Sequence, residues 1–398
     1  MAKYADLREK ALLFLLCVWF IWFFNFTGRI MFAPILPLLE DEFLVAHAQA
    51  SGIFVFSSAG TGIAVIVAGL YSGTLGYKKS IIVSLLLLSL ASFLISSIHR
   101  FWLFYPFGFI FGFSLGLYLP AAIPLMTEYY SPKTWGRVLA IHDTGASIAV
   151  FAAPLIALFL LQFFAWRGIY VVFGVIFLVY TLVFSLASSE VKHSNRPKGL
   201  FPVLVKMRSL WLMAAIWFFA TGANLGVYSV TPLYLAKELG LSVGYANTLL
   251  GVSRLGGIGV AIACGFLIDR FDVRRIIFLV LLIAGGLTIL MGVASARYIG
   301  TILFLQACCV TAFFPAGLVA IAQAFSREMR SLASGIIFFM SVPGAGLIPY
   351  LLGVSGDLYS FRLGIIILGV CIALSSKLVF NLKELEYAGQ ETVSRDES

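Results

Sequence analysis

Residues 249–275 read LLGVSRLGGIGVAIACGFLIDRFDVRR, an apolar and glycine-rich stretch that ends in a charged turn. Before that turn it contains one arginine, whose neighbours in the sequence are mainly apolar. The arginine is Arg254, and an arginine at the centre of a bilayer costs about 2.5–3.5 kcal/mol on insertion scales. Ionisable residues inside membrane helices are rare and mark substrate or ion sites by default. The stretch therefore predicts a membrane-spanning helix that carries a functional arginine.

The composition of the whole chain is typical of a membrane protein. Of its 398 residues, 61% are hydrophobic and 11% are charged, which excludes an ordinary soluble globular protein. A helix needs about 20 predominantly apolar residues to cross a bilayer. The sequence therefore predicts an all-α membrane protein with twelve transmembrane helices. They are expected at 11–39, 50–71, 80–98, 101–127, 138–162, 168–187, 210–234, 246–267, 275–295, 299–325, 332–354 and 363–381.

The distribution of lysine and arginine orients these helices. With a cytoplasmic N-terminus, 20 of the 27 basic residues fall on the cytoplasmic side, five fall on the other side, and Arg29 and Arg254 lie within helices. Because cytoplasmic loops carry an excess of Lys and Arg, we expect a multi-pass protein of the plasma (inner) membrane with both termini in the cytoplasm. The net charge of +9 then follows from topology and from attraction to the anionic lipid bilayer, and it predicts no nucleic-acid partner.

The sequence repeats itself at a nearly constant offset. An offset of 195 residues aligns landmarks of the fourth to sixth apolar runs with those of the tenth to twelfth without a gap. Offsets of 196 and 198 residues align earlier parts of the two halves, as small loop insertions would give. The aligned pairs are Pro120 and Pro315, Ser131 and Ser326, Pro154 and Pro349, Trp166-Arg167 and Phe361-Arg362, Gly174 and Gly369, Pro34 and Pro232, and Glu40 and Glu238.

This repeat predicts two pseudo-symmetric six-helix bundles. We expect an N-terminal bundle at 1–187 and a C-terminal bundle at 209–382. The polar and basic segment 188–208 is the expected cytoplasmic linker, and 383–398 is the expected cytoplasmic tail. Parallel repeats with a binding site near the bilayer midplane are known among secondary transporters.

The charged turn at the end of residues 249–275 resembles a motif of a known protein family. The loop motif G-x-x-x-D-R-x-G-x-R-R of the major facilitator superfamily is similar to five residues of this turn: Gly265, Asp269, Arg270, Arg274 and Arg275. Asp272 stands where the motif has its second glycine. The resemblance implies a transporter that works by alternating access and is not an enzyme. It also implies a gating role for Asp269, Arg270 and Arg274, with Asp269 pairing with a neighbouring helix end.

The matching turn in the first half, at 69–79, keeps less of this motif. It reads GLYSGTLGYKK, so its outer glycines and two lysines match. Gly73 and Thr74 stand where the motif has its Asp and Arg. We therefore expect a strong gating latch only in the second half, at Asp269.

Polar residues of two apolar runs form the candidate substrate site. Asn25 and Arg29 are one helical turn apart in 11–39, and Asn224 and Tyr228 have the same spacing in 210–234. Both helix faces meet across a central cavity if the halves pack as in the superfamily. We predict that Arg29 and Arg254 bind an anionic substrate, because a guanidinium suits a carboxylate or phosphate through two parallel hydrogen bonds. The other three side chains are predicted to add hydrogen bonds.

The alternative is that each arginine pairs with a buried acid or with carbonyls at a helix end. No acid lies in the middle of any predicted span, which favours substrate binding. The helix at 11–39 is also similar to that of the anion:cation symporter branch, although Gly28 replaces the Asp of that branch's Asp-Arg pair. Tyr118 is a further candidate for lining the cavity, with packing as its alternative role.

Three charged residues near cytoplasmic helix ends are candidates for gating or coupling. Asp143 lies near one end of 138–162, where a carboxylate can titrate and carry a proton. A gate residue that pairs with the arginine-rich cytoplasmic loops is the favoured reading of Asp143. Glu128 and Arg137 flank the turn EYYSPKTWGR and are predicted to form a structural or gating ion pair.

These features predict a secondary transporter of a small organic anion, most simply a mono- or dicarboxylate, which is coupled to protons or exchanged for a counter-anion. The first alternative is an efflux antiporter for drugs and amphipathic compounds, and the second is a receptor or scaffold that has lost transport. No Walker-type sequence and no cluster with metal-ligand spacing occurs in the sequence. We therefore expect no ATP, cofactor or metal, and we expect a monomer.

Overall fold

The structure, a computed structural model, describes residues 10–131, 134–189, 201–268 and 270–382. Within these ranges, twelve helical segments are long and apolar enough to cross a membrane. The prediction of an all-α membrane protein with twelve membrane helices is therefore confirmed. The segments are Lys10–Phe43, His47–Ala68, Tyr77–Ser96, Phe101–Tyr129, Trp135–Leu161, Trp166–Ala187, Arg208–Lys237, Val243–Ile268, Val273–Val293, Ile299–Ala324, Leu332–Leu358 and Phe361–Asn381.

The described residues fall into two compact units. One unit is bounded by Met1–Ser194 together with Ser242–Gly251, and the other by Asn195–Leu241 together with Val252–Ser398. The sequence did not indicate that Ser242–Gly251 groups with the first half. Most of the expected linker at 188–208 lies outside the described residues, so the expected domain limits stay a prediction.

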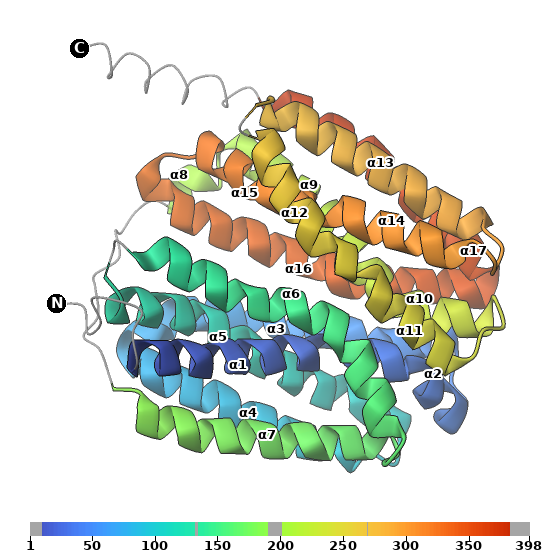
Figure 1. The fold of residues 1–398 in the computed structure, drawn as a ribbon, viewed down its shortest axis with the longest axis horizontal. Helices are drawn as coiled ribbons and strands as arrows, with labels where there is room; N and C mark the ends of the chain where they lie inside the picture. Colours follow the sequence, from blue (N-terminus) through green and yellow to red (C-terminus); the bar gives the residue numbers. More distant parts are fainter. Residues whose placement is uncertain (1–9, 132–133, 190–200, 269, 383–398) are drawn as a thin grey trace. The chain divides into compact units, whose positions relative to one another are not determined.

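The first unit consists of long helices that follow one another in chain order (Figure 1). Its elements are α1 (Lys10–Ile30), α2 (Phe32–Phe43), α3 (His47–Leu75), α4 (Tyr77–Ser96), a short 3-10 turn (Phe101–Leu103), α5 (Phe104–Tyr129), α6 (Trp135–Leu161), α7 (Trp166–Ala187) and most of α11 (Val243–Ser253).

The second unit has the same kind of helices but more interruptions. Its elements are α8 (Phe201–Leu204), α9 (Arg208–Thr221), a π-helical turn (Gly222–Gly226), α10 (Val227–Lys237), α12 (Leu255–Ile268), α13 (Val273–Val293), α14 (Ile299–Thr311), α15 (Phe313–Ala324), α16 (Arg327–Leu358), α17 (Phe361–Ser375) and a final 3-10 turn (Ser376–Asn381).

Corresponding helices pack through glycine in both units. In the first unit α4 lies beside α7 (Figure 1), and the Ser89 hydroxyl donates to the Gly174 carbonyl at 2.8 Å. In the second unit α13 lies beside α17, and a methyl group at Gly369 would lie 2.7 Å from the backbone nitrogen of Ile289. Small residues let membrane helices approach closely. Gly174 and Gly369 are aligned by the 195-residue offset, so the sequence repeat corresponds to a repeated helix packing.

Two long helices are interrupted where proline removes a hydrogen-bond donor. Pro34 has no N–H for the carbonyl of Ile30, and α1 ends at that residue before α2 begins. Pro315 likewise has no N–H for the carbonyl of Thr311, where α14 ends before α15 begins. The interruptions therefore follow from the sequence, since helix kinks are almost always found at proline, glycine or a π turn.

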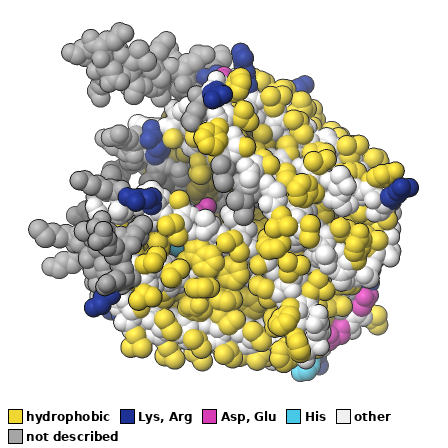
Figure 2. Space-filling view, viewed as in Figure 1, with side chains coloured by type: hydrophobic (Ala, Val, Ile, Leu, Met, Phe, Trp, Pro, Cys, Tyr) yellow, Lys and Arg dark blue, Asp and Glu magenta, His cyan; other side chains and the backbone are white. Residues whose placement is uncertain are grey.

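The surface of the helices is suited to lipid. Hydrophobic side chains cover much of the face drawn in Figure 2, and most of its charged side chains lie towards the edges. On α7 the exposed apolar side chains recur every three or four residues, which is one face of a helix. They are Val171, Val175, Leu178, Val179, Leu182, Val183 and Leu186. The chain is therefore an integral multi-pass membrane protein.

Candidate functional site

Arg254 lies at a break between two helices of the chain. The helix α11 ends at Ser253 and α12 begins at Leu255, so Arg254 itself is outside both. Its side chain is 6% exposed. The Nη1 atom donates to Oδ1 of Asn224 at 2.7 Å, and the guanidinium carbon lies 5.0 Å from the centre of the Tyr228 ring. The structure thus brings together the three polar residues that the sequence indicated in the second half.

The rest of the Arg254 guanidinium has no partner. Its Nε and Nη2 atoms are buried and make no hydrogen bond with any residue in the described ranges. These two N–H groups lie along one edge of the planar fork, which is the edge that holds a carboxylate through two parallel hydrogen bonds. Asn224 therefore occupies one nitrogen and leaves free the pair that suits an anion.

Asn224 lies at the middle of a π-helical turn. The turn spans Gly222–Gly226, between α9 and α10, and the N–H of Val227 donates back to the carbonyl of Gly222. Such a turn contains one residue more than an α-helix would at the same place, and π turns are frequent at functional sites. Both residues of the Arg254–Asn224 pair are therefore held by irregular backbone inside membrane helices.

Arg29 has a different environment, in the last turn of α1. It is half-buried, and its guanidinium carbon lies 5.9 Å from the centre of the Phe26 ring. Within the described part of the chain, Arg29 makes no hydrogen bond or ion pair. Asn25 is buried and its Nδ2 lies 3.5 Å from the Leu115 carbonyl on α5, so it contacts that helix instead of Arg29. A chamber common to Arg29 and Arg254 stays a prediction, because they belong to different units.

Tyr118 is fully buried in an aromatic stack of the first unit. Its ring lies beside those of Trp22 and His142, at centroid distances of 5.7 and 6.0 Å, and these two rings lie 5.6 Å from each other, with all planes nearly parallel. The phenol oxygen lies 2.9 Å from the Val18 carbonyl and 3.1 Å from Nε2 of His142. A carbonyl only accepts and the phenol has one proton, so both bonds form together only when His142 donates through Nε2. These contacts favour packing as the role of Tyr118.

The predicted ion pair between Glu128 and Arg137 is absent from the described part of the chain. Arg137 is exposed in the first turn of α6. The indole of Trp135 closes the turn instead, since its Nε1 donates to the carbonyls of Thr127 and Tyr130, at 2.9 Å each. The described residues therefore show no Glu128–Arg137 pair at this turn, and a gating role of the two residues stays a prediction.

The remaining gating candidates have few contacts. Asp143 is exposed on α6, without an ion pair to any described residue. Asp269 lies outside the described residues, so the expected latch stays a prediction, and Arg270 is exposed. The backbone N–H of Arg274 donates to Oδ1 of Asp272 at 2.9 Å, so Asp272 caps α13. This explains an aspartate at the position of the motif's glycine.

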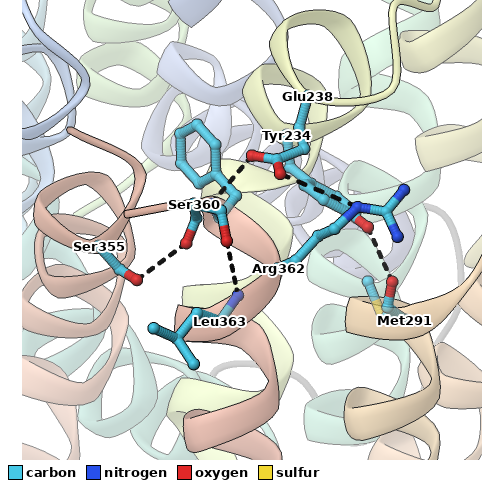
Figure 3. Close-up of polar contacts among 8 residues, drawn as sticks. Tyr234, Glu238, Met291, Ser355, Ser360, Arg362 and Leu363 are labelled. Carbon is cyan, nitrogen blue, oxygen red and sulfur yellow. Dashed lines mark hydrogen bonds and ion pairs between the residues drawn. The ribbon is translucent and has the colours of Figure 1, made fainter. Parts of the chain in front are cut away.

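A polar cluster ties the end of α10 to the start of α17 in the second unit (Figure 3). One carboxylate oxygen of Glu238 accepts from the backbone N–H of Phe361 at 3.0 Å, and the other lies 3.8 Å from Nε of Arg362. The hydroxyl of Tyr234 donates to the Met291 carbonyl on α13 at 2.8 Å (Figure 3). Three helices of the unit are thereby joined at one end.

The first unit has a matching cluster, displaced by two residues. Glu42 lies 2.6 Å from Nη1 of Arg167 and accepts from Nε1 of Trp166 at 2.5 Å, and Nη2 of Arg167 donates to the Ile98 carbonyl at 2.7 Å. Glu40, which the repeat aligns with Glu238, instead lies 2.5 Å from Nδ1 of His47. The sequence repeat aligns the arginines of the two clusters, whereas the glutamates that contact them, Glu42 and Glu238, are not aligned with each other.

Two buried polar residues were not predicted from the sequence. Gln306 is completely buried and donates to the Ala223 carbonyl at 2.9 Å, and His142 contacts Tyr118 as described. Each is a polar side chain within an apolar run, which is the signal that the sequence offered. No group of three metal-binding side chains gathers among the described residues.

Comparison with known proteins gives relatives at low identity. A protein of Bacillus subtilis (strain 168), named provisionally as the niacin/nicotinamide transporter NiaP, is 22% identical over 324 residues, which are 78% of this chain and 79% of that protein. Protein TsgA of Escherichia coli O157:H7 (strain EC4115 / EHEC) is 28% identical over 263 residues, 65% of this chain and 63% of that protein.

Solved structures share the fold. A bacterial homologue of the human lysosomal transporter Spinster, in an inward-facing and unoccupied conformation, matches with a TM-score of 0.81 and 16% identity over 96% of this chain and 98% of that one. A D-xylose–proton symporter matches with a TM-score of 0.78 and 14% identity, covering 94% of this chain and 99% of that one. At these identities the likeness shows the fold alone.

A family profile decides the classification. The profile described as Major Facilitator Superfamily matches residues 18–303 and 260–395. The chain therefore belongs to the major facilitator superfamily, whose members are secondary transporters and not enzymes.

Proposed function

We propose that this superfamily member transports a small organic anion, most simply a mono- or dicarboxylate, by alternating access. The observation that carries the proposal is the free edge of Arg254. Two donors, Nε and Nη2, are buried without an acceptor in the described part of the chain. A buried donor that has lost its acceptor costs about 1–3 kcal/mol, and more when it is charged. A carboxylate satisfies both donors and neutralises the charge at once.

The charges around this site favour an anion over a cation. The described ion pairs involve neither Arg254 nor Arg29. A site with a fixed positive charge attracts anions and repels cations over several ångströms in a low dielectric. Arg29, in the first unit, is the second positive charge of the proposal. A proton or a counter-anion is the proposed coupling partner of the carboxylate.

The name of one relative suggests two test compounds that differ in charge. The name of NiaP mentions niacin and nicotinamide. Niacin has a carboxylate where nicotinamide has a neutral amide. We propose that the carboxylate is required by this chain. The test is uptake of radiolabelled nicotinate, lactate, succinate and nicotinamide into proteoliposomes, with an imposed pH gradient in one arm and preloaded anion in another.

The expected result is uptake of at least one carboxylate and no uptake of nicotinamide. Acceleration by an inward proton gradient indicates symport, and acceleration by internal anion indicates exchange. Transport of nicotinamide alone, or of none of the three carboxylates, contradicts the proposal. Empty liposomes and liposomes with the heat-denatured protein serve as controls for leakage.

A second candidate function is efflux of amphipathic compounds, and one observation favours it. Trp217 packs against three aromatic rings, those of Phe313, Phe314 and Phe338, at centroid distances of 5.1, 5.7 and 4.8 Å. The Trp217 indole Nε1 is buried without a hydrogen-bond partner in the described ranges. Extrusion of a cationic dye that persists when Arg254 is replaced by alanine supports this candidate over anion transport.

The cellular setting follows the same proposal. We propose a monomer in the cytoplasmic (inner) membrane with both termini inside, in keeping with the positive charges of the loops. A tag at the C-terminus that a protease cleaves only in inverted vesicles supports this orientation. Cleavage in intact cells with a closed membrane contradicts it.

A further inference from the structure

The π turn that carries Asn224 leaves one backbone carbonyl without its usual partner. In an α-helix the N–H of Val227 would donate to the carbonyl of Ala223, four residues earlier. Here that N–H donates to the carbonyls of Gly222 and Asn224. The Ala223 carbonyl instead accepts from Nε2 of Gln306 on α14, at 2.9 Å. A side chain of another helix thus replaces the hydrogen bond that the π turn removes.

The amide of Gln306 is oriented by this contact. A carbonyl only accepts, so the nitrogen of the amide must face Ala223. The same nitrogen lies 3.4 Å from the hydroxyl oxygen of Thr288, which donates its own proton to the Ala284 carbonyl at 2.8 Å. The Oε1 atom of Gln306 is buried without a hydrogen bond among the described residues. A buried amide with an unpaired oxygen contributes little to the stability of the fold. The contact that Gln306 does make is its donation to the Ala223 carbonyl of the π turn.

The opposite side of the turn is held by close backbone packing. A methyl group at Gly222 would overlap with Cδ1 of Ile348, and one at Gly226 would lie 3.0 Å from the carbonyl oxygen of Gly344 on α16. The glycines therefore allow α16 to contact the turn, while Gln306 holds it from α14. The turn is therefore contacted by two other helices, α14 and α16.

The register of this turn decides where Asn224 points. Successive side chains of an α-helix are rotated by about 100° around its axis, so gaining or losing one residue at a π turn redirects the side chains within it. The 2.7 Å bond between Asn224 and Arg254 exists in the π register. A return to the α register moves the Asn224 amide away from Arg254.

We propose that Gln306 is a positioning residue of the anion site, which fixes the π turn in the register that orients Asn224 toward Arg254. This inference rests on the proposed function, because Arg254 is its anion-binding group. Gln306 acts through the backbone of Ala223 and touches neither the anion nor Arg254. Its loss weakens anion binding without removing any group that contacts the anion.

The test measures anion affinity in a double-mutant cycle on the purified full-length protein. The dissociation constants of nicotinate, lactate and succinate are measured for the wild type, Gln306→Met, Asn224→Ala and the double variant. Gln306→Met keeps the size of the side chain and removes the donor. We expect it to raise the dissociation constant by about three- to tenfold, the effect of one hydrogen bond. In the Asn224→Ala background the same change has no further effect, because the group that it positions is gone.

A matched control and a conservative variant separate positioning from packing. Gln323→Met makes the same chemical change at an exposed position of α15 and leaves the affinity unchanged. Gln306→Glu donates to the Ala223 carbonyl only when its carboxyl group is protonated. Its affinity relative to wild type is therefore expected to recover as the pH is lowered from 8 to 5. In the Asn224→Ala background this recovery is expected to be absent, whereas relief of charge repulsion or of a packing defect would appear in both backgrounds.

The outcomes distinguish this inference from the function on which it rests. If the wild type binds none of the three carboxylates, the proposed function fails and the inference fails with it. If the wild type binds one and Gln306→Met leaves its affinity unchanged, only the inference is overturned. Equal effects of Gln306→Met with and without Asn224 also overturn it. Should Gln306→Met not fold, the pH response of Gln306→Glu decides.

Discussion

The two arginines inside the membrane helices differ in how they are held. Arg254 is fixed at a helix break by a 2.7 Å hydrogen bond to Asn224, whereas Arg29 lies in the regular helix α1 without a hydrogen-bond or ion-pair partner in the described residues. A group held in its binding geometry loses less conformational entropy when a ligand arrives. Under the proposed function, the second unit therefore presents an arginine that is already oriented, whereas the described residues hold Arg29 by no hydrogen bond or ion pair.

The difference has its origin in the sequence repeat. The 198-residue offset aligns Asn224 with Phe26, and it aligns Arg29 with Val227. In the first unit the ring of Phe26 lies 5.9 Å from the Arg29 guanidinium, and in the second unit an amide occupies that aligned position. The two halves keep the same helices but place their charges at different positions. The pseudo-symmetry of the fold therefore does not extend to the polar and charged residues of these helices.

The largest expected effect comes from Arg254→Lys. An ammonium keeps the positive charge but cannot form the two parallel hydrogen bonds of the free guanidinium edge. We expect carboxylate uptake into proteoliposomes to fall by about 100-fold, since two charge-assisted hydrogen bonds are lost. Arg297→Lys, at an exposed position, is the matched control and is expected to be neutral. Full activity of Arg254→Lys would refute the preorganised site.

The next effect is expected from Asn224→Ala. It removes the acceptor that orients Arg254, and a hydrogen bond to a charged group contributes about 1.5–3 kcal/mol. Because part of this is regained by relaxation, we expect about a tenfold rise in the dissociation constant of the transported carboxylate, measured by equilibrium binding. Asn224→Asp is expected to bind still more weakly, because its carboxylate neutralises Arg254. Tighter binding by the aspartate variant would show that the arginine does not hold the anion.

A smaller effect is expected from substitutions of Arg29, and it tests whether the two arginines differ in their role. Arg29→Lys keeps the charge. Because the guanidinium group of Arg29 makes no hydrogen bond with the described residues, we expect uptake within about twofold of the wild type. Arg29→Ala removes the charge and is expected to lower uptake about fivefold through the weaker attraction of the anion. The salt dependence of uptake is the second readout. A loss by Arg29→Lys as large as that of Arg254→Lys would remove the distinction between the two units.

The smallest effects are expected in stability at the polar clusters. Glu238→Ala leaves the N–H of Phe361 without its acceptor, and we expect a loss of about 1 kcal/mol, as for other helix caps. Glu238→Gln keeps an acceptor oxygen and is expected to cost less than half of that. Glu42→Ala breaks a partly exposed ion pair, which contributes about 0.2–1 kcal/mol. Thermal unfolding in detergent ranks the three variants, and a reversed order would contradict the capping role of Glu238.

The membrane helices were predictable from the sequence, and the geometry of the site was not. Runs of about 20 apolar residues have few alternatives in a bilayer, because every backbone polar group must be bonded within its own helix. The π turn at Gly222–Gly226 accepts a hydrogen bond from Gln306, a residue far away in the sequence. No local pattern encodes such a register shift. The spacing of Asn224 and Tyr228 did indicate the correct helix face, although it assumed a regular helix.

Contacts of charged side chains could not be predicted from the sequence either. Glu128 and Arg137 are close in sequence, but they form no pair in the described ranges, where the indole of Trp135 donates to the carbonyls of the turn. The repeat aligns Glu40 with Glu238, whereas Glu42 contacts Arg167. Which nearby group a side chain contacts depends on distances of a few ångströms, which the sequence does not contain.

The glycine contact between the π turn and α16 has a mechanical consequence. A methyl group at Gly344 would lie 2.5 Å from the Phe218 carbonyl oxygen, so the two helices touch backbone to backbone at this level. The side chain of Ile348 on α16 also lies against Gly222 and Gly226, so it fills the space that these two glycines leave. Any larger residue at one of these positions would therefore push α16 away from the segment that carries Asn224.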